Sequence, residues 1–74
     1  MADKTDWEAM AANLLKAELK RKGVTYAQLV AKLAEMGIAE KEANVANKLS
    51  RGKFTAAFML ACLSAIGADA VRLY

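Results

Sequence analysis

The chain has 74 residues with a formal net charge of +3, and 57% of them are hydrophobic. A chain of this length forms at most one small domain, near the lower limit for folding alone. It contains 4 glycines and no proline, which is too little turn chemistry for a β-sandwich or a barrel. The composition therefore predicts an all-α fold, a compact bundle of four short helices with a short C-terminal tail.

The first helix is expected over about residues 6–22. Thr5 and Glu8 have the spacing of a capping box, in which two side chains satisfy backbone N–H groups at the helix start. The expected inward stripe consists of residues four apart, namely Trp7, Ala11, Leu15 and Leu19. Three basic residues at 20–22 complement the negative end of the helix, and Gly23 ends it.

The second helix is expected over residues 25–36. Thr25 and Gln28 form another capping box, and Gly37 ends the helix. Its core side is predicted to consist of Leu29, Val30, Leu33 and Met36.

The third helix is expected over residues 39–51. Ala39 is a poor cap, so Glu40 and Glu42 are expected to stabilise the positive end of the helix. Val45 and Leu49 face inward by their spacing, and Gly52 ends the helix.

The fourth helix is expected over residues 55–66, with Thr55 as its cap. Its inward residues are predicted to be Phe58, Met59, Cys62, Leu63 and Ile66, whereas Leu60 points away from this stripe and is expected to be exposed. The tail, residues 70–74, fits a docked coil, a short edge strand or a dimerisation arm equally well.

The residues offer little for catalysis. The chain has no histidine, no glycine-rich phosphate loop and one cysteine, and its carboxylates lie at helix starts or beside lysines. We therefore expect no enzyme activity, no metal and no cofactor. Cys62 is expected to be a buried apolar group in a reducing cytoplasm. No apolar run approaches ~20 residues, and no signal peptide is expected.

The third helix carries the feature most suggestive of function. Lys41, Asn44, Lys48 and Arg51 are spaced three, four and three residues apart, with Asn47 beside them. Arginine and asparagine can form paired hydrogen bonds with base edges in the major groove of DNA, and lysine can reach phosphate. The simpler alternative is a polar helix face that is merely solvated.

Helix starts offer a second set of contacts. Backbone N–H groups after Thr25 and Thr55 point toward solvent at the positive ends of two helices, where phosphate binds well. The side chains expected to assist are Tyr26, Gln28 and Lys53. Simple capping explains both threonines equally well.

A family resemblance extends over part of the chain. Residues 25–33 (TYAQLVAKL) resemble the first helix of the helix-turn-helix in phage-repressor and Cro-like regulators, and residues 49–53 (LSRGK) resemble the end of their recognition helix. Through residues 15–26 and 47–55 the chain is also similar to a family of small bacterial proteins of unknown function. The repressor resemblance implies a helix-turn-helix domain that binds DNA, with a role in transcriptional regulation.

The chain departs from the repressor pattern in one place. Between Leu33 and Ala46 it has roughly six residues more than that motif expects, which predicts a longer second helix and an earlier start of the third. The residues that match the family best are those near the end of the third helix: Asn47, Lys48, Arg51 and Lys53.

The sequence predicts two kinds of binding partner for this chain. Double-stranded DNA is the expected ligand, and a homodimer is expected because apolar residues are in surplus near both chain ends: Trp7, Leu14, Leu60, Leu73 and Tyr74. Trp7 has a second interpretation as a packed core residue. The alternative function is a protein-interaction module that retains the fold without binding DNA, since Glu35, Glu40 and Glu42 near the turn would repel a phosphate backbone.

Overall fold

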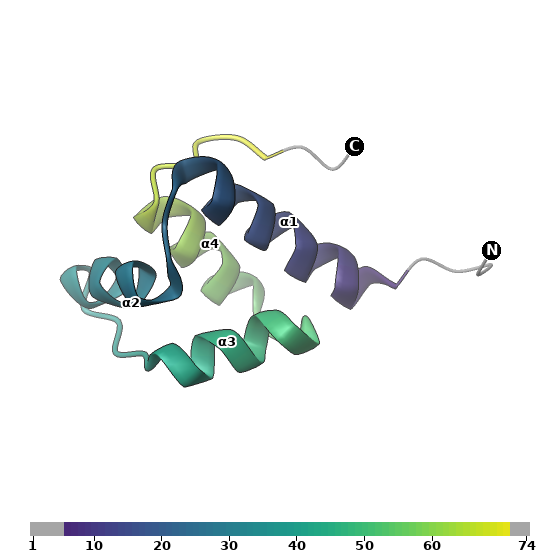
Figure 1. Cartoon of the computed structure of the whole chain (residues 1–74), viewed down its shortest axis with the longest axis horizontal. Helices are drawn as coiled ribbons and strands as arrows, with labels where there is room; N and C mark the ends of the chain where they lie inside the picture. Colours follow the sequence, from purple (N-terminus) through teal and green to yellow (C-terminus); the bar gives the residue numbers. More distant parts are fainter. Residues whose placement is uncertain (1–5, 72–74) are drawn as a thin grey trace.

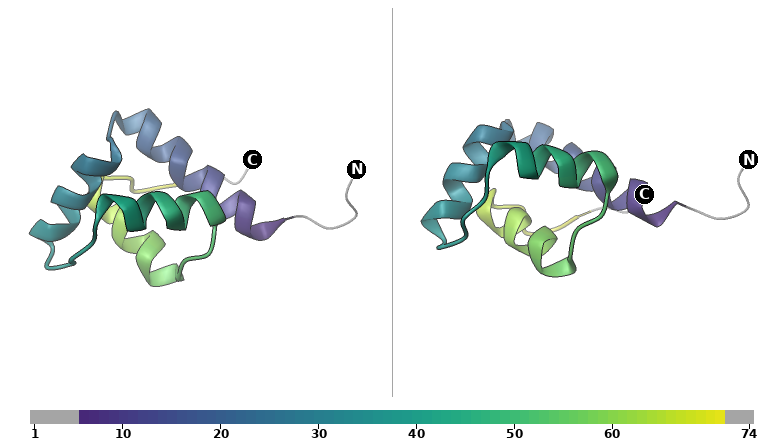
Figure 2. Two further views of the ribbon diagram at one scale, coloured as in Figure 1. Left: turned by 60° about the horizontal axis from the view of Figure 1, so that its bottom comes forward. Right: turned by 90° about the horizontal axis from the view of Figure 1, so that it is seen from below.

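The computed structural model describes residues 6–71, and within this range the chain forms four α-helices and no strand (Figure 1). The helices are α1 (Trp7–Lys22), α2 (Tyr26–Glu35), α3 (Glu42–Arg51) and α4 (Ala56–Ala65). Helices α1 and α2 each pack against both α3 and α4. Helix α3 lies at the lower edge of Figure 1, and the turned views in Figure 2 show that α4 lies toward the back of Figure 1. The predicted all-α bundle is confirmed.

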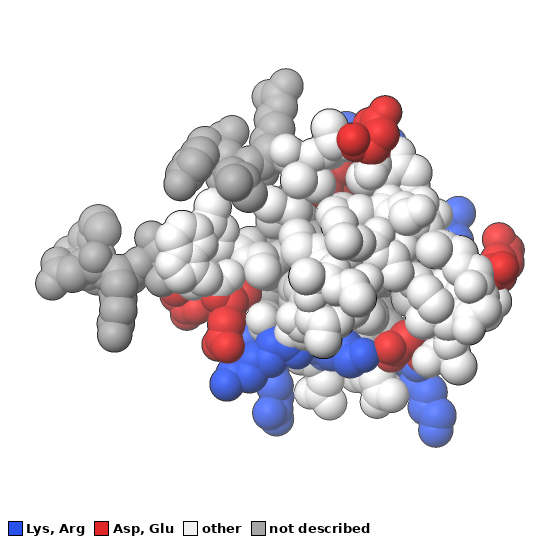
Figure 3. Space-filling view, turned by 180° about the vertical axis from the view of Figure 1, so that it is seen from behind, with Lys and Arg blue, Asp and Glu red and all other residues white. Residues whose placement is uncertain are grey.

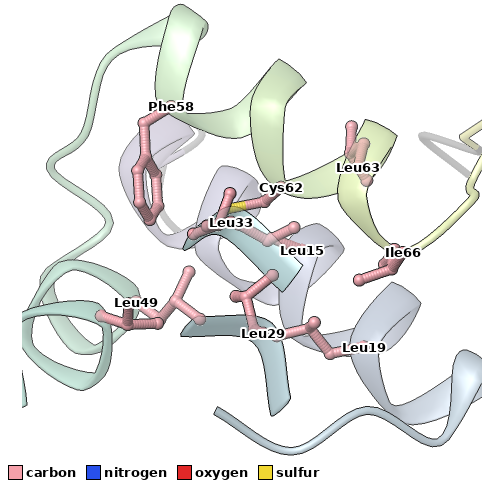
Figure 4. Packing of buried hydrophobic residues seen from close by; sticks show 10 residues of the cluster. Leu15, Leu19, Leu29, Leu33, Leu49, Phe58, Cys62, Leu63 and Ile66 are labelled. Atoms are coloured by element: carbon pink, nitrogen blue, oxygen red, sulfur yellow. The ribbon is translucent and has the colours of Figure 1, made fainter. Parts of the chain in front are cut away.

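The core is a single cluster to which all four helices contribute. Its buried members are Leu15, Leu19, Leu29, Leu33, Val45, Leu49, Phe58, Cys62, Leu63 and Ile66. Figure 4 shows Cys62 of α4 pointing toward Leu33 and Leu15, so its thiol fills the centre of the bundle. Each large apolar side chain contributes about 1.5–3 kcal/mol by leaving water. The predicted inward residues of α3 and α4 are confirmed, although Met59 is only half-buried.

The start of α1 differs from the prediction in two respects. Its N-cap is Asp6, whose carboxylate accepts a hydrogen bond from the Ala9 N–H at 3.0 Å, whereas the predicted capping box was built on Thr5, which lies outside the described residues. Trp7 is 65% exposed and does not belong to the core. Four residues turn a helix by about 40° more than a full circle, so residues spaced by fours move gradually around the helix and away from its buried side. The first turn of α1 also extends past the other helices (Figures 1 and 2).

The connection between α2 and α3 is longer than expected. Helix α3 begins at Glu42, so the predicted start near Ala39 is wrong, and residues 36–41 form a non-helical connector. Met36 caps α2 in this connector and is 46% exposed, which also corrects its assignment to the core. Ile38 anchors the connector, because it packs against the core and its N–H donates to the Leu33 carbonyl at 2.9 Å. The residues between α2 and α3 therefore form a connector and do not lengthen either helix.

Gly52 is the one glycine of the four that lies directly against the backbone of another helix. It ends α3 with φ of 71°, and a Cβ at this position would collide with the backbone carbonyl of Glu8. Glycine is therefore required twice over, by the left-handed conformation and by the contact. This approach fixes the end of α3 against the start of α1.

The remaining predictions concern the apolar surplus. Leu60 is 66% exposed, as predicted, whereas Leu14 is half-buried. Ala70 and Val71 are exposed coil, so an edge strand does not begin there. Leu73 and Tyr74, like Thr5, lie outside the described residues.

Candidate nucleic-acid interface

The outer face of α3 carries an exposed ridge of polar side chains. Val45 and Leu49 turn into the core and hold the helix down. On the opposite side Asn44, Asn47 and Arg51 are all exposed, at spacings of three and four residues. We call these three residues the α3 ridge. No ion pair within residues 6–71 involves Arg51, so its guanidinium group is available to a ligand.

Lys48 does not belong to this ridge. Its Nζ donates to Glu40 Oε2 at 2.8 Å and lies 4.4 Å from the centre of the Phe58 ring. The side chains of Lys48 and Glu40 are only 35% and 12% exposed. The predicted stripe is therefore interrupted at Lys48, because this ammonium group is already paired with a carboxylate and an aromatic face. The pair joins the connector to α3 and α4.

Lys41 is also placed differently from the prediction. It is the N-cap of α3 rather than a residue within the helix, and it makes no side-chain capping bond. The first N–H groups of α3 therefore have no side-chain acceptor at the cap, and the exposed Lys41 directly precedes them in the chain. Glu42, in the first turn, offsets part of this positive end.

The start of α2 has the cap that the sequence predicts. The Gln28 N–H donates to Thr25 Oγ1 at 3.1 Å, and the Thr25 N–H donates to Gln28 Oε1 at 2.9 Å. These oxygens are occupied by the helix itself, which leaves the Gln28 amide NH₂, the Tyr26 hydroxyl and nearby backbone N–H groups for other contacts. Helices α2 and α3 are packed together, and the start of α2 lies close to the start of α3 (Figures 1 and 2).

Lysines surround this start of α2. One shallow hollow is lined by Lys16 and Lys20 together with Thr25 and Tyr26. A second hollow, on the other side of the turn, is lined by Lys22, Gln28 and Lys32, with Glu35 at its margin. Sequence reasoning missed this grouping, because the basic residues come from two helices whose relative position only the fold defines.

The start of α4 contributes less. The Phe58 N–H donates to Thr55 Oγ1 at 3.0 Å, which confirms Thr55 as the cap. Lys53 precedes it, exposed, with its Nζ 3.9 Å from Glu8 Oε2. Such an exposed and distant ion pair contributes little. Lys53 is therefore accessible to an anionic partner, and its predicted contact with phosphate stays a prediction.

Cys62 offers no accessible chemistry. The pKa of its thiol is raised from 9.0 to about 11, mainly by burial and less by the charge of Glu40, while the charge of Lys48 acts in the opposite direction. A protonated, fully buried thiol is a poor nucleophile and a poor metal ligand. Among residues 6–71 no group of three or more metal-binding side chains comes together. In the same range no helix has both the length and the apolarity needed to cross a bilayer.

Comparison with known proteins assigns a family. Residues 7–71 match a family model described as a domain of unknown function, DUF6471, and the chain belongs to this family. The predicted membership of a family of unknown function is thereby confirmed. Searches of curated proteins and of solved structures each found no match.

Proposed function

We propose that this protein binds double-stranded DNA as a repressor-like helix-turn-helix protein, with α3 as the recognition helix. The observation that carries the proposal is the α3 ridge, in which two amides and a guanidinium group are exposed together on one helix face. Asparagine and arginine are the side chains that pair with adenine and guanine edges in the major groove. Binding at specific sites would give the protein a role in transcriptional regulation.

Phosphate contacts would come from the neighbouring helix starts. Lys41 at the start of α3 and the lysine-lined start of α2 both place cations beside backbone N–H groups. The first turn of a helix that packs beside the recognition helix commonly meets the DNA backbone. Lys53 and Thr55 would add a contact after the end of α3.

The direct test is a titration of the protein against a labelled random-sequence duplex, read by fluorescence anisotropy. Affinity should fall steeply between about 50 and 200 mM salt, because cations displaced from DNA drive the binding. Arg51→Gln should weaken binding at least about fivefold, corresponding to ~1 kcal/mol. The matched control is Arg21→Gln, which removes the same charge from the end of α1 and keeps a donor near Glu18; it should change affinity much less.

Lys48 provides a finer test of the same surface. Because its ammonium group is held by Glu40, Lys48→Ala should weaken binding less than Arg51→Ala does. Glu40→Gln removes a negative charge beside the ridge and releases Lys48, so it should strengthen binding and steepen its salt dependence. The opposite order of the Lys48 and Arg51 variants would contradict the assignment of the ridge.

A protein-interaction module is the second candidate. The observation that favours it is the exposure of Leu60 and Trp7, since large apolar groups on a surface often mark contacts between proteins. If the protein does not bind the duplex even at about 50 mM salt, the DNA proposal is contradicted and the protein-interaction module is the remaining candidate.

A further inference from the structure

The side chains of the α3 ridge lie within a narrow sector of the helix surface. Successive residues of an α-helix are turned by about 100°, so Asn47 and Arg51 lie within roughly 60° of Asn44 around the axis. Within residues 6–71 neither the two amides nor the guanidinium group forms a hydrogen bond or an ion pair with another side chain. Figure 3 shows basic side chains along the lower edge of the molecule, the edge at which α3 lies in Figure 1. The ridge therefore presents its hydrogen-bonding groups in one direction, beside cations that favour a polyanion.

We infer that the α3 ridge selects a stretch of about four base pairs with adenine at one end and guanine at the other. This inference rests on the proposed function, because it concerns which duplex the recognition helix prefers. Asparagine forms paired hydrogen bonds with N6 and N7 of adenine, and arginine with O6 and N7 of guanine. Asn44 is therefore assigned to the terminal adenine, Arg51 to the guanine, and Asn47 to a second adenine between them.

The spacing of these bases follows from the rise of the helix. In a helix that lies along the major groove, Asn47 is ~4.5 Å and Arg51 ~10.5 Å along the axis from Asn44, because each residue adds about 1.5 Å. Successive base pairs are about 3.4 Å apart. The two ends of the ridge therefore address base pairs about three steps apart, and Asn47 addresses a base pair roughly one step from the adenine end.

The ridge has no group that reads cytosine. Aspartate and glutamate accept a hydrogen bond from the N4 amino group of cytosine, and the one carboxylate of α3 belongs to Glu42. Glu42 is turned by roughly 160° from Asn44 around the helix axis, so it points away from the base edges. Lys48, on the flank of the ridge, is held by Glu40. Base preference therefore depends on the two amides and on Arg51.

The experiment is selection of duplexes from a random-sequence library by the full chain, followed by sequencing of the bound fraction. Wild type should enrich an A·T pair and a G·C pair about three steps apart, with another A·T pair beside the first. Arg51→Ala should lower the preference at the G·C end alone, and Asn44→Ala that at the A·T end alone, each at least about fivefold. Ser50→Ala is the matched control, since Ser50 is exposed on α3 outside the sector, and it should leave the selected sequence unchanged.

Base analogues test whether the guanine is read from the major groove. 7-Deazaguanine lacks the N7 acceptor, whereas hypoxanthine keeps N7 and O6 and lacks only the amino group in the minor groove. At the selected G·C pair, 7-deazaguanine should weaken binding of wild type at least about fivefold, and hypoxanthine should weaken it much less. In Arg51→Ala the two analogues should bind equally. The reverse order of the analogues with wild type would contradict the inference.

The outcomes separate this inference from the proposed function. Duplex binding without a preferred sequence would overturn the inference and leave DNA binding in place. A preference that Arg51→Ala and Asn44→Ala both leave unchanged would do the same. Failure to bind any duplex even at about 50 mM salt would overturn the proposed function and this inference together.

Discussion

Helices α3 and α4 are each ten residues long and contribute to the same core, but their outer faces differ in character. The outside of α3 carries amides and a guanidinium group, whereas the outside of α4 carries alanine, serine and one leucine. The inner residues of both helices are equally apolar. The comparison teaches that the inner face determines how a helix packs, while the outer face can be adapted to a partner at little cost in stability.

The largest expected effect concerns the glycine that ends α3. Gly52→Ala should destabilise the protein by about 3–5 kcal/mol, because left-handed strain and a collision with the Glu8 backbone act together. Gly23→Ala is the control, since Gly23 has nearly the same φ but open space around it; it should cost only about 1–2 kcal/mol. Urea unfolding followed by circular dichroism measures both, and equal losses would refute the role assigned to the contact.

The next prediction compares a buried leucine on the inner face of α3 with an exposed leucine on the outer face of α4. Leu49→Ala should lower the free energy of unfolding by about 3 kcal/mol, because Leu49 is fully buried. Leu60→Ala, measured at concentrations where the chain is monomeric, should change it by no more than about 0.5 kcal/mol. Similar losses for the two leucines would show that the outer face of α4 contributes to the monomer core.

A smaller effect depends on pH and on the inner face of α4. Folding raises the pKa of the Cys62 thiol to about 11, so between pH 9 and 11 the folded chain retains a proton that the unfolded chain loses. Stability contributed by the neutral thiol is therefore complete below pH 9 and is lost as pH rises toward 11. Relative to Cys62→Ala, wild type should lose about 1 kcal/mol between pH 8 and 10. An unchanged difference between the two proteins would contradict the raised pKa.

Local signals predicted most of the fold. Capping residues, glycines after the helices and apolar periodicity located α2 and α4 within one residue at each end. Each of these signals acts within a single helical turn, so the sequence contains it in full. Trp7 was misplaced because a stripe spaced by fours drifts around a helix, and the start of α3 was misplaced because its cap has no side-chain bond.

The candidate site was less predictable than the fold. Periodicity placed Asn44, Asn47 and Arg51 on one exposed face, as the structure has them. It could not predict that Lys48 pairs with Glu40 eight residues away, or that Phe58 lies beneath its ammonium group, since both contacts depend on how the connector and α4 pack. The lysines around the start of α2 were missed for the same reason.

The central claim is that the α3 ridge, and not the outer face of α4, contacts the DNA duplex. Sedimentation velocity of a labelled duplex with wild type, Arg51→Gln and Leu60→Glu tests this claim directly, because it reports how much duplex each chain binds. Arg51→Gln should release the duplex, whereas Leu60→Glu should bind it much as wild type does. If the two substitutions produce the same loss, or Arg51→Gln does not change the sedimentation of the duplex, the assignment of DNA binding to α3 is contradicted.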